Sequence, residues 1–290
     1  MKLLKKAGSI LFCLLPALLA FAIQIVVTFA GIFLWAFLLI WKDPARIRQN
    51  GGAAFLTDII SLTEDSQFLV LLTASYATIA ALALGFWYWK RFVPKHRPRR
   101  KPSALLHPAM LAGMALLVFG LQYISNYLAL LVAAINPGWY ETYERMMESI
   151  GFGDVTPALV LYSVIIAPIS EELIFRGVTL SYAVRAMPFF AANTLQAFLF
   201  GLFHGNAVQG VYAFVAGLFC GYICQKGGSL WLSILFHMMF NLWGTFAPGF
   251  LSYTGGLLPL HLVIFAAASA VTLCGVALYQ KGLALRGQTP

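Results

Sequence analysis

Residues 157–186 read PALVLYSVIIAPISEELIFRGVTLSYAVRA, a stretch in which long apolar runs surround Glu171, Glu172 and Arg176. A membrane-spanning helix needs about 20 predominantly apolar residues, so this stretch is long enough to cross a bilayer. A charged side chain at the centre of such a helix costs roughly 2.5–3.5 kcal/mol on insertion scales. Two adjacent glutamates at that depth therefore predict a functional site inside the membrane.

The rest of the chain also has the composition of a membrane protein. Hydrophobic residues make up 61% of its 290 residues and charged residues only 10%, whereas soluble domains carry about 25% charged residues. Further apolar segments that are long enough to span lie at 10–40, 67–89, 109–135, 188–205, 207–225, 229–248 and 258–280. The expected fold class is an all-α, polytopic transmembrane helical bundle of about eight spans.

The net charge of +9 follows a topological pattern. Basic residues crowd the linker between the second and third spans, at Lys90, Arg91, Lys95, Arg97, Arg99, Arg100 and Lys101. Cytoplasmic loops carry such an excess of Lys and Arg, so the linker and the N-terminus are expected inside and the acidic loop at 136–156 outside. The expected partners are membrane lipids and no nucleic acid. In a bacterium, this pattern predicts a multi-pass protein of the plasma (inner) membrane.

The two parts of the chain differ in what they indicate about function. Residues 1–108 hold the first two spans and the basic loop, with an apolar N-terminal run too long for a cleaved signal peptide. Residues 109–290 are expected to form the functional core, because the ionisable residues at membrane depth lie between 171 and 241. The cysteines, including Cys220 and Cys224, lie in apolar runs and are interpreted as packing residues.

The two glutamates are predicted to face different surroundings. Glu172 and Arg176 are four residues apart, so they share a helical face and are expected to pair. Glu171 points about 100° away from Glu172 on the helical wheel, so it is not expected to pair with Arg176. We expect it to face a cavity, where it suits the role of a general base.

Two histidines and an asparagine on later spans add further hydrogen-bonding groups. His237 and Asn241 share one face of a span, where both can bind a developing oxyanion. If the fourth and fifth spans meet in a tight turn near residues 187–188, Glu171 and His204 lie at similar depths. Counted in the same way from Ser229, at the start of their span, His237 and Asn241 are predicted to lie closer to the membrane surface than Glu171 and His204.

Three short motifs bring these residues together along the chain: Glu171-Glu172-x-x-x-Arg176, Phe200-x-x-x-His204 and His237-x-x-x-Asn241. In this order, on successive apolar helices, they resemble the CPBP family of CAAX-processing and bacteriocin-processing endopeptidases, also called the Abi family. The resemblance covers roughly residues 155–250 and implies an eight-helix intramembrane protease. It implies that Glu171 with His204 activates the attacking water. His237 with Asn241 would then form the oxyanion hole, and the ion pair would hold the site together.

The resemblance leaves the cofactor and the substrate open. Two histidines and a glutamate would fill three positions of a catalytic zinc site, so the residue types permit zinc. No HExxH motif occurs, and a water-activating glutamate without a cofactor accounts better for the asparagine. The expected substrate is a membrane-associated protein or peptide, with or without a lipid group. An ion- or proton-coupled transporter and a non-catalytic membrane scaffold are the alternative functions.

Overall fold

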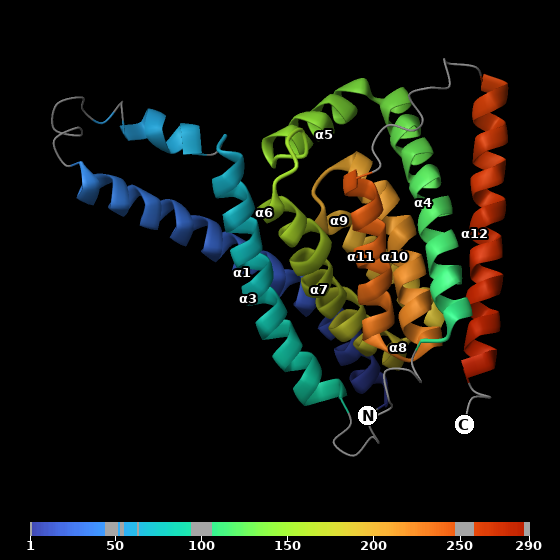
Figure 1. Ribbon diagram of the computed structural model, residues 1–290. Helices are drawn as coiled ribbons and strands as arrows, with labels where there is room; N and C mark the ends of the chain where they lie inside the picture. Colours follow the sequence, from blue (N-terminus) through green and yellow to red (C-terminus); the bar gives the residue numbers. More distant parts are fainter. Residues whose placement is uncertain are drawn as a thin grey trace.

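The computed structural model describes residues 2–43, 52, 55–62, 64–93, 106–246 and 258–286, which are almost entirely helical and include no strand (Figure 1). The first four helices with assigned bounds are α1 (Lys2–Lys42), α3 (Ser66–Phe92), α4 (Pro108–Ile135) and α5 (Pro137–Ser149). One long segment follows, composed of α6 (Pro157–Val160), η2 (Leu161–Ile166), α7 (Ala167–Glu172), η3 (Leu173–Thr179) and α8 (Leu180–Ala186). The chain continues through α9 (Phe189–Phe203), α10 (Ala207–Gly227), α11 (Leu230–Phe246) and α12 (Leu258–Arg286).

The predicted polytopic helical bundle is confirmed. Six helical segments of the described chain are long and apolar enough to cross a membrane: 10–42, 66–92, 108–135, 157–186, 207–227 and 259–286. The other two predicted spans are apolar but shorter, with 15 residues in α9 and 17 in α11. The segment 157–186 packs against α1, α3, α9 and α11. The division of the chain at residue 108 stays a prediction.

The acidic connection at 136–156 is not simply a loop, because α5 occupies residues 137–149. Asn136 caps this helix by accepting a hydrogen bond from the backbone N–H of Gly138 at 3.0 Å, and Pro137 occupies its first turn. Both are common signals for a helix start, and they outweigh the polar composition that suggested a loop. In Figure 1, α5 lies across one end of the bundle.

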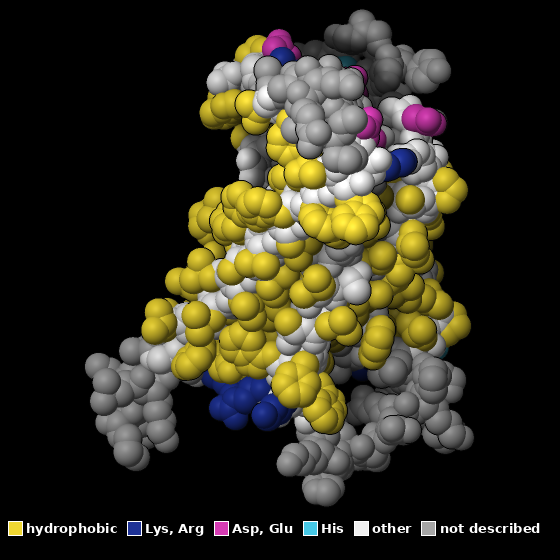
Figure 2. All heavy atoms as spheres, turned by 90° about the vertical axis from the view of Figure 1, so that its left-hand side faces the viewer, with side chains coloured by type: hydrophobic (Ala, Val, Ile, Leu, Met, Phe, Trp, Pro, Cys, Tyr) yellow, Lys and Arg dark blue, Asp and Glu magenta, His cyan; other side chains and the backbone are white. Residues whose placement is uncertain are grey.

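Charged side chains gather at the two ends of the molecule, and a broad hydrophobic belt lies between them (Figure 2). Basic residues occupy the last turns of α3, α8, α10 and α12, at Lys90, Arg91, Arg185, Lys226 and Arg286. The acidic residues Glu141, Glu144 and Glu148 lie on α5, at the opposite end. The basic residues at positions 95–101, which are predicted to lie in the cytoplasm, are outside the described part of the chain. Long apolar helices with charged residues gathered at their two ends are typical of an integral membrane protein.

Helices α4 and α12 pack along each other at one edge of the bundle (Figure 1). Glycines on both helices make this contact close. A Cβ atom at Gly113 would lie 2.5 Å from the backbone nitrogen of Tyr279, and one at Gly282 would lie 2.5 Å from that of Met110. Small residues let membrane helices approach to backbone contact, where dispersion forces hold them together.

We therefore expect Gly113→Ala to destabilise the protein. The added methyl group meets backbone atoms that cannot rotate away, and overpacking of this kind costs about 1–3 kcal/mol. Thermal unfolding in detergent micelles measures the effect. The matched control is Gly85→Ala, because a Cβ there would make an ordinary contact, 3.5 Å from the Leu173 side chain. Equal unfolding temperatures for the two variants would contradict the role given to Gly113.

Candidate active site

A fully buried ion pair lies at the centre of the site. The Nη1 atom of Arg176 is 2.9 Å from Oε1 of Glu172, as the four-residue spacing predicted. Arg176 also donates from Nη2 to the carbonyl oxygen of Gly217 on α10 at 3.1 Å, and Ser233 on α11 donates to Oε2 of Glu172 at 2.7 Å. A buried ion pair needs such additional hydrogen bonds to offset its desolvation. These bonds join the segment 157–186 to α10 and α11.

Wider, π-helical turns flank the short helix α7 that carries both glutamates. The turn η2 ends at Ile166, just before Pro168, and η3 begins at Leu173, just after Glu172. Proline lacks the backbone N–H that a regular helix requires, so an adjustment of the hydrogen-bond pattern is expected near it. Such π turns inside helices occur frequently at functional sites, because the extra residue redirects the side chains that follow.

Glu171 faces a cavity, and one imidazole links it to the buried pair. The Nε2 atom of His237 lies 3.6 Å from Oε2 of Glu171, and its Nδ1 atom lies 2.9 Å from Oε1 of Glu172. A carboxylate only accepts hydrogen bonds, so Glu172 fixes a proton on Nδ1 and turns Nε2 toward Glu171. The Glu171 side chain is 18% exposed, whereas that of Glu172 is not exposed at all.

The prediction that His237 lies shallower than Glu171 is wrong. It assumed that α11 begins level with the turn at 187–188. Instead, α11 begins deeper, because a Cβ at Gly177 would lie 3.5 Å from the Leu230 side chain. Counted from this contact, Glu171 is six residues along its helix and His237 is seven along its own, which is slightly less than two helical turns for each. The two side chains therefore lie at nearly equal depth, and their nearest polar atoms are 3.6 Å apart.

His204 ends α9 and lines the same cavity as Glu171. Its Nδ1 atom lies 2.8 Å from the carbonyl oxygen of Phe200, and its ring meets the Phe200 ring edge-to-face. Because the carbonyl accepts the Nδ1 proton, the neutral ring keeps Nε2 as a proton acceptor. Gly205, with φ +70°, then reverses the chain into α10, a conformation that glycine adopts readily.

Asn241 lines the cavity next to His237 on α11, but part of its hydrogen-bonding capacity is used. Its Nδ2 atom donates to the carbonyl oxygen of Ser163, in the π turn η2, at 2.8 Å. An amide has two N–H groups, so one stays free for a ligand. The cavity therefore brings together Glu171, His204, His237 and Asn241, beside the buried ion pair.

The cavity has a volume of about 460 Å³, and helices from most of the chain contribute to its wall. Helix α5 contributes Tyr140, Tyr143, Met146 and Met147, at the acidic end of the molecule. Burial raises the pKa of the Tyr143 phenol, so this side chain is a neutral hydrogen-bonding group at physiological pH. This part of the wall was not predicted from the sequence.

Three neutral polar residues that support the ion pair were also missed: Ser233, Gln196 and Asn193. Gln196 donates to Asn193 at 2.7 Å and shares the Gly217 carbonyl oxygen with Arg176. Asn193 and Gln196 are three residues apart on an otherwise apolar helix. That spacing was the available signal, because two amides on one helical face of a membrane span are expected to meet polar partners.

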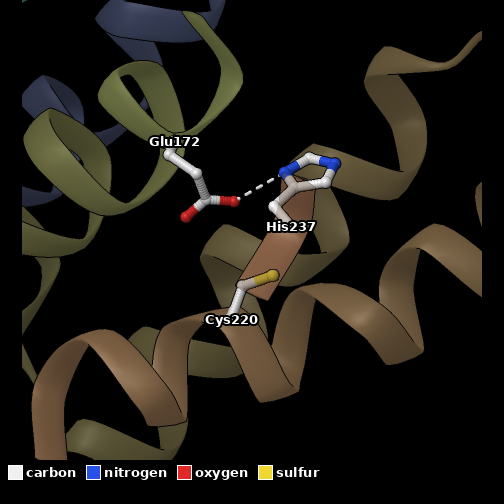
Figure 3. Close-up of side chains that lie close together, drawn as sticks. All are labelled: Glu172, Cys220 and His237. Atoms are coloured by element: carbon white, nitrogen blue, oxygen red, sulfur yellow. Dashed lines mark hydrogen bonds and ion pairs between the residues drawn. The ribbon is translucent and has the colours of Figure 1, made fainter. Parts of the chain in front are cut away.

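Cys220 lies closer to the site than its interpretation as a packing residue suggested (Figure 3). Its sulfur and ligand atoms of Glu172 and His237 all lie within 4.8 Å of one another. This donor set does not fit a metal ion, because Arg176 already neutralises the Glu172 carboxylate and a cation there would face the guanidinium. In the described chain this cluster does not include His204, one of the two histidines considered for zinc.

The part of the chain that carries these motifs is similar to a family of CAAX prenyl endopeptidases and to a putative membrane peptidase. Residues 154–243 match the family model described as type II CAAX prenyl endopeptidase Rce1-like. The resemblance is confirmed over this segment. Over 85 residues the chain is 26% identical to "Putative membrane peptidase YdiL" of Bacillus subtilis (strain 168), which covers 29% of this chain and 35% of that protein. The chain thus matches about a third of its curated relative's length. No solved structure matches.

The Rce1-like segment, residues 154–243, contains all six candidate site residues, yet it does not enclose the cavity alone. Helices α1, α3, α4 and α5 precede this segment and supply a large part of the wall. Their contributions include Gln24, Thr73, Tyr76, Gln122, Ser125, Asn126 and Tyr143. The residues that surround a ligand in the cavity therefore come both from residues 154–243 and from the helices that precede them.

Proposed function

We propose that this protein is an intramembrane endopeptidase in which Glu171 and His204 activate a water molecule for attack on a peptide bond. The supporting observation is that the Glu171 carboxylate stands apart from the buried ion pair and faces a cavity that His204 and His237 also line. A base, a proton-transfer partner and hydrogen-bond donors around one cavity are the groups that peptide hydrolysis requires.

We propose the following steps for the reaction, which the positions of these groups support. Glu171 takes a proton from water, and the water oxygen forms a bond to the carbonyl carbon of the substrate. Asn241 and the protonated form of His237 donate to the oxyanion that results. The C–N bond then breaks, and the proton returns to the leaving amine through Glu171 or His204. Glu172 and Arg176 keep the His237 ring in place throughout.

We infer that the substrate is a protein or peptide held at the membrane. The basic end of the bundle is assigned to the cytoplasm by the positive-inside rule, which places the N-terminus inside and α5 on the outer side. Under this assignment the cavity lies toward the outer side, next to α5. In a bacterium the protein would reside in the inner membrane, in contact with anionic lipids.

The experiment that tests this function can be carried out before any substrate is identified. Cells that produce the wild-type protein are compared with cells that produce Glu171→Gln, and new protein termini in their membrane and secreted fractions are identified by mass spectrometry. We expect termini that depend on Glu171. Purified protein is then tested on a peptide that spans such a site, on a farnesylated Cys-a-a-X peptide and on the same peptide without lipid. Identical sets of termini from the two strains would contradict a protease.

We also propose that catalysis is independent of metal. The donor set at Glu172 does not fit a cation, and Glu171 can activate water without a Lewis acid. Treatment with 1,10-phenanthroline or EDTA is expected to change the cleavage rate by less than about twofold, where a catalytic zinc enzyme would lose its activated water. Elemental analysis of the purified protein provides the control. Stoichiometric zinc whose removal abolishes cleavage and whose return restores it would refute this proposal.

A further inference from the structure

Two buried hydroxyl groups in the cavity wall have no hydrogen-bond partner in the described part of the chain. They belong to Tyr76 on α3 and Ser163 on η2, each 7% exposed, and both residues line the cavity. Most buried polar groups in proteins are paired, and an unpaired one costs about 1–3 kcal/mol. A hydroxyl left unpaired beside a catalytic base is available to bind the reacting groups.

The hydrogen-bond donors within the recognised motifs are, in contrast, partly used. Asn241 donates to the Ser163 carbonyl oxygen, and Nδ1 of His237 is paired with Glu172. The Nδ1 atom of His204 is paired with the Phe200 carbonyl oxygen. An oxyanion that forms in the cavity would therefore find few free N–H groups, and a hydroxyl that has no other partner would add a donor to those of Asn241 and His237.

The Tyr76 ring is held firmly in position. It belongs to a buried cluster with Ala77 and Ala80, against which Tyr162 and Phe203 pack. Tyr76 and Tyr162 both line the cavity with Glu171 and lie close enough to its carboxylate to interact electrostatically. Of these two phenols, the one found buried without a hydrogen-bond partner in the described residues is that of Tyr76. The Tyr76 hydroxyl is thus fixed by packing while its bond is unused, which is the condition for a preorganised donor.

We propose that the Tyr76 hydroxyl donates a hydrogen bond to the oxyanion that forms when water attacks the substrate carbonyl beside Glu171. The inference rests on the proposed protease function. As the carbonyl oxygen gains negative charge, the O–H···O bond from the neutral phenol strengthens, so it stabilises the transition state more than the substrate. Tyr76 lies outside residues 154–243, so α3 would complete a site whose base comes from the Rce1-like segment.

The test compares Tyr76→Phe with the wild type in detergent micelles. The substrate is fluorescent casein, or a peptide that spans a cleavage site found by the comparison of protein termini. Removal of one oxyanion donor is expected to lower kcat by about 10²–10³-fold and to change KM by less than about threefold. The control is Tyr279→Phe, which removes the hydroxyl of another buried tyrosine that bonds to the Ile223 carbonyl oxygen and is absent from the cavity wall. Its kcat is expected to stay within about threefold of wild type.

The outcomes separate this inference from the protease function. All variants are assayed below their unfolding temperatures, measured by circular dichroism, so that a loss of rate reports chemistry and not folding. A kcat within about threefold of wild type for Tyr76→Phe, or an effect confined to KM, would overturn the role of Tyr76 while Glu171→Gln stays inactive. If Glu171→Gln cleaves as well as the wild type, the protease function itself fails.

Discussion

Glu171→Gln is expected to abolish peptide cleavage, with a fall in kcat of about 10²–10⁴-fold, the usual contribution of a general base. The amide keeps the size of the side chain but cannot accept the proton of the attacking water. Glu171 stands outside the ion pair between Glu172 and Arg176, so the fold should not depend on its charge. The rate of peptide cleavage and the unfolding temperature are measured on the same preparation.

The control for this variant makes the same substitution at another glutamate. Glu148 is exposed on α5 and is not part of the cavity wall, so Glu148→Gln is expected to retain the wild-type rate. An active Glu171→Gln would remove the base from the proposed mechanism. An inactive Glu148→Gln would show that the loss reflects charge at the acidic end of the molecule, and not the chemistry of Glu171.

Arg176→Leu is expected to be the most destabilising of the substitutions considered. It leaves the Glu172 carboxylate buried without a countercharge, and breaking a buried ion pair in this way typically costs about 3–5 kcal/mol. Arg176 also donates to the Gly217 carbonyl oxygen on α10, so the contact between helices weakens as well. Equilibrium unfolding of the purified protein in mixed micelles measures the free-energy change.

A double variant separates the charge from the packing. Replacing both partners, in Arg176→Leu with Glu172→Leu, removes the unpaired charge and is expected to recover much of the lost stability. It should stay inactive, because His237 loses the carboxylate that holds its Nδ1 atom. If the double variant is no more stable than Arg176→Leu alone, the charge at Glu172 is not what destabilises the single variant.

The sequence predicted the helices well because membrane spans depend on long apolar runs, which a single chain displays directly. The predicted segment 157–186 coincides with the helical segment observed, and α4 begins within a residue of its predicted start. The pairing of Glu172 with Arg176 also followed from spacing alone, because both residues lie on one helix. The amphipathic helix α5 was missed, since its capping signals were read as part of a loop.

Relations between helices could not be obtained from the sequence in the same way. The depth of His237 depends on where α11 enters the bundle, which no local pattern encodes. Tyr76 and Ser233 are neutral polar residues in apolar spans, where ordinary contacts between helices account for most such residues. Their proximity to the two glutamates appears only when α3, the segment 157–186 and α11 are placed side by side.

The hydrogen bonds of Glu172 also bear on the biogenesis of the protein. Its partner His237 follows it by 65 residues, and Ser233 follows by 61. The ribosome therefore delivers the two glutamates to the bilayer well before the residues of α11 that orient them. A nascent chain that ends before α11 holds Glu171 but lacks His237 and Asn241. The complete set of site residues is thus brought together only after the seventh predicted span has been inserted, and partly synthesised chains lack the assembled site.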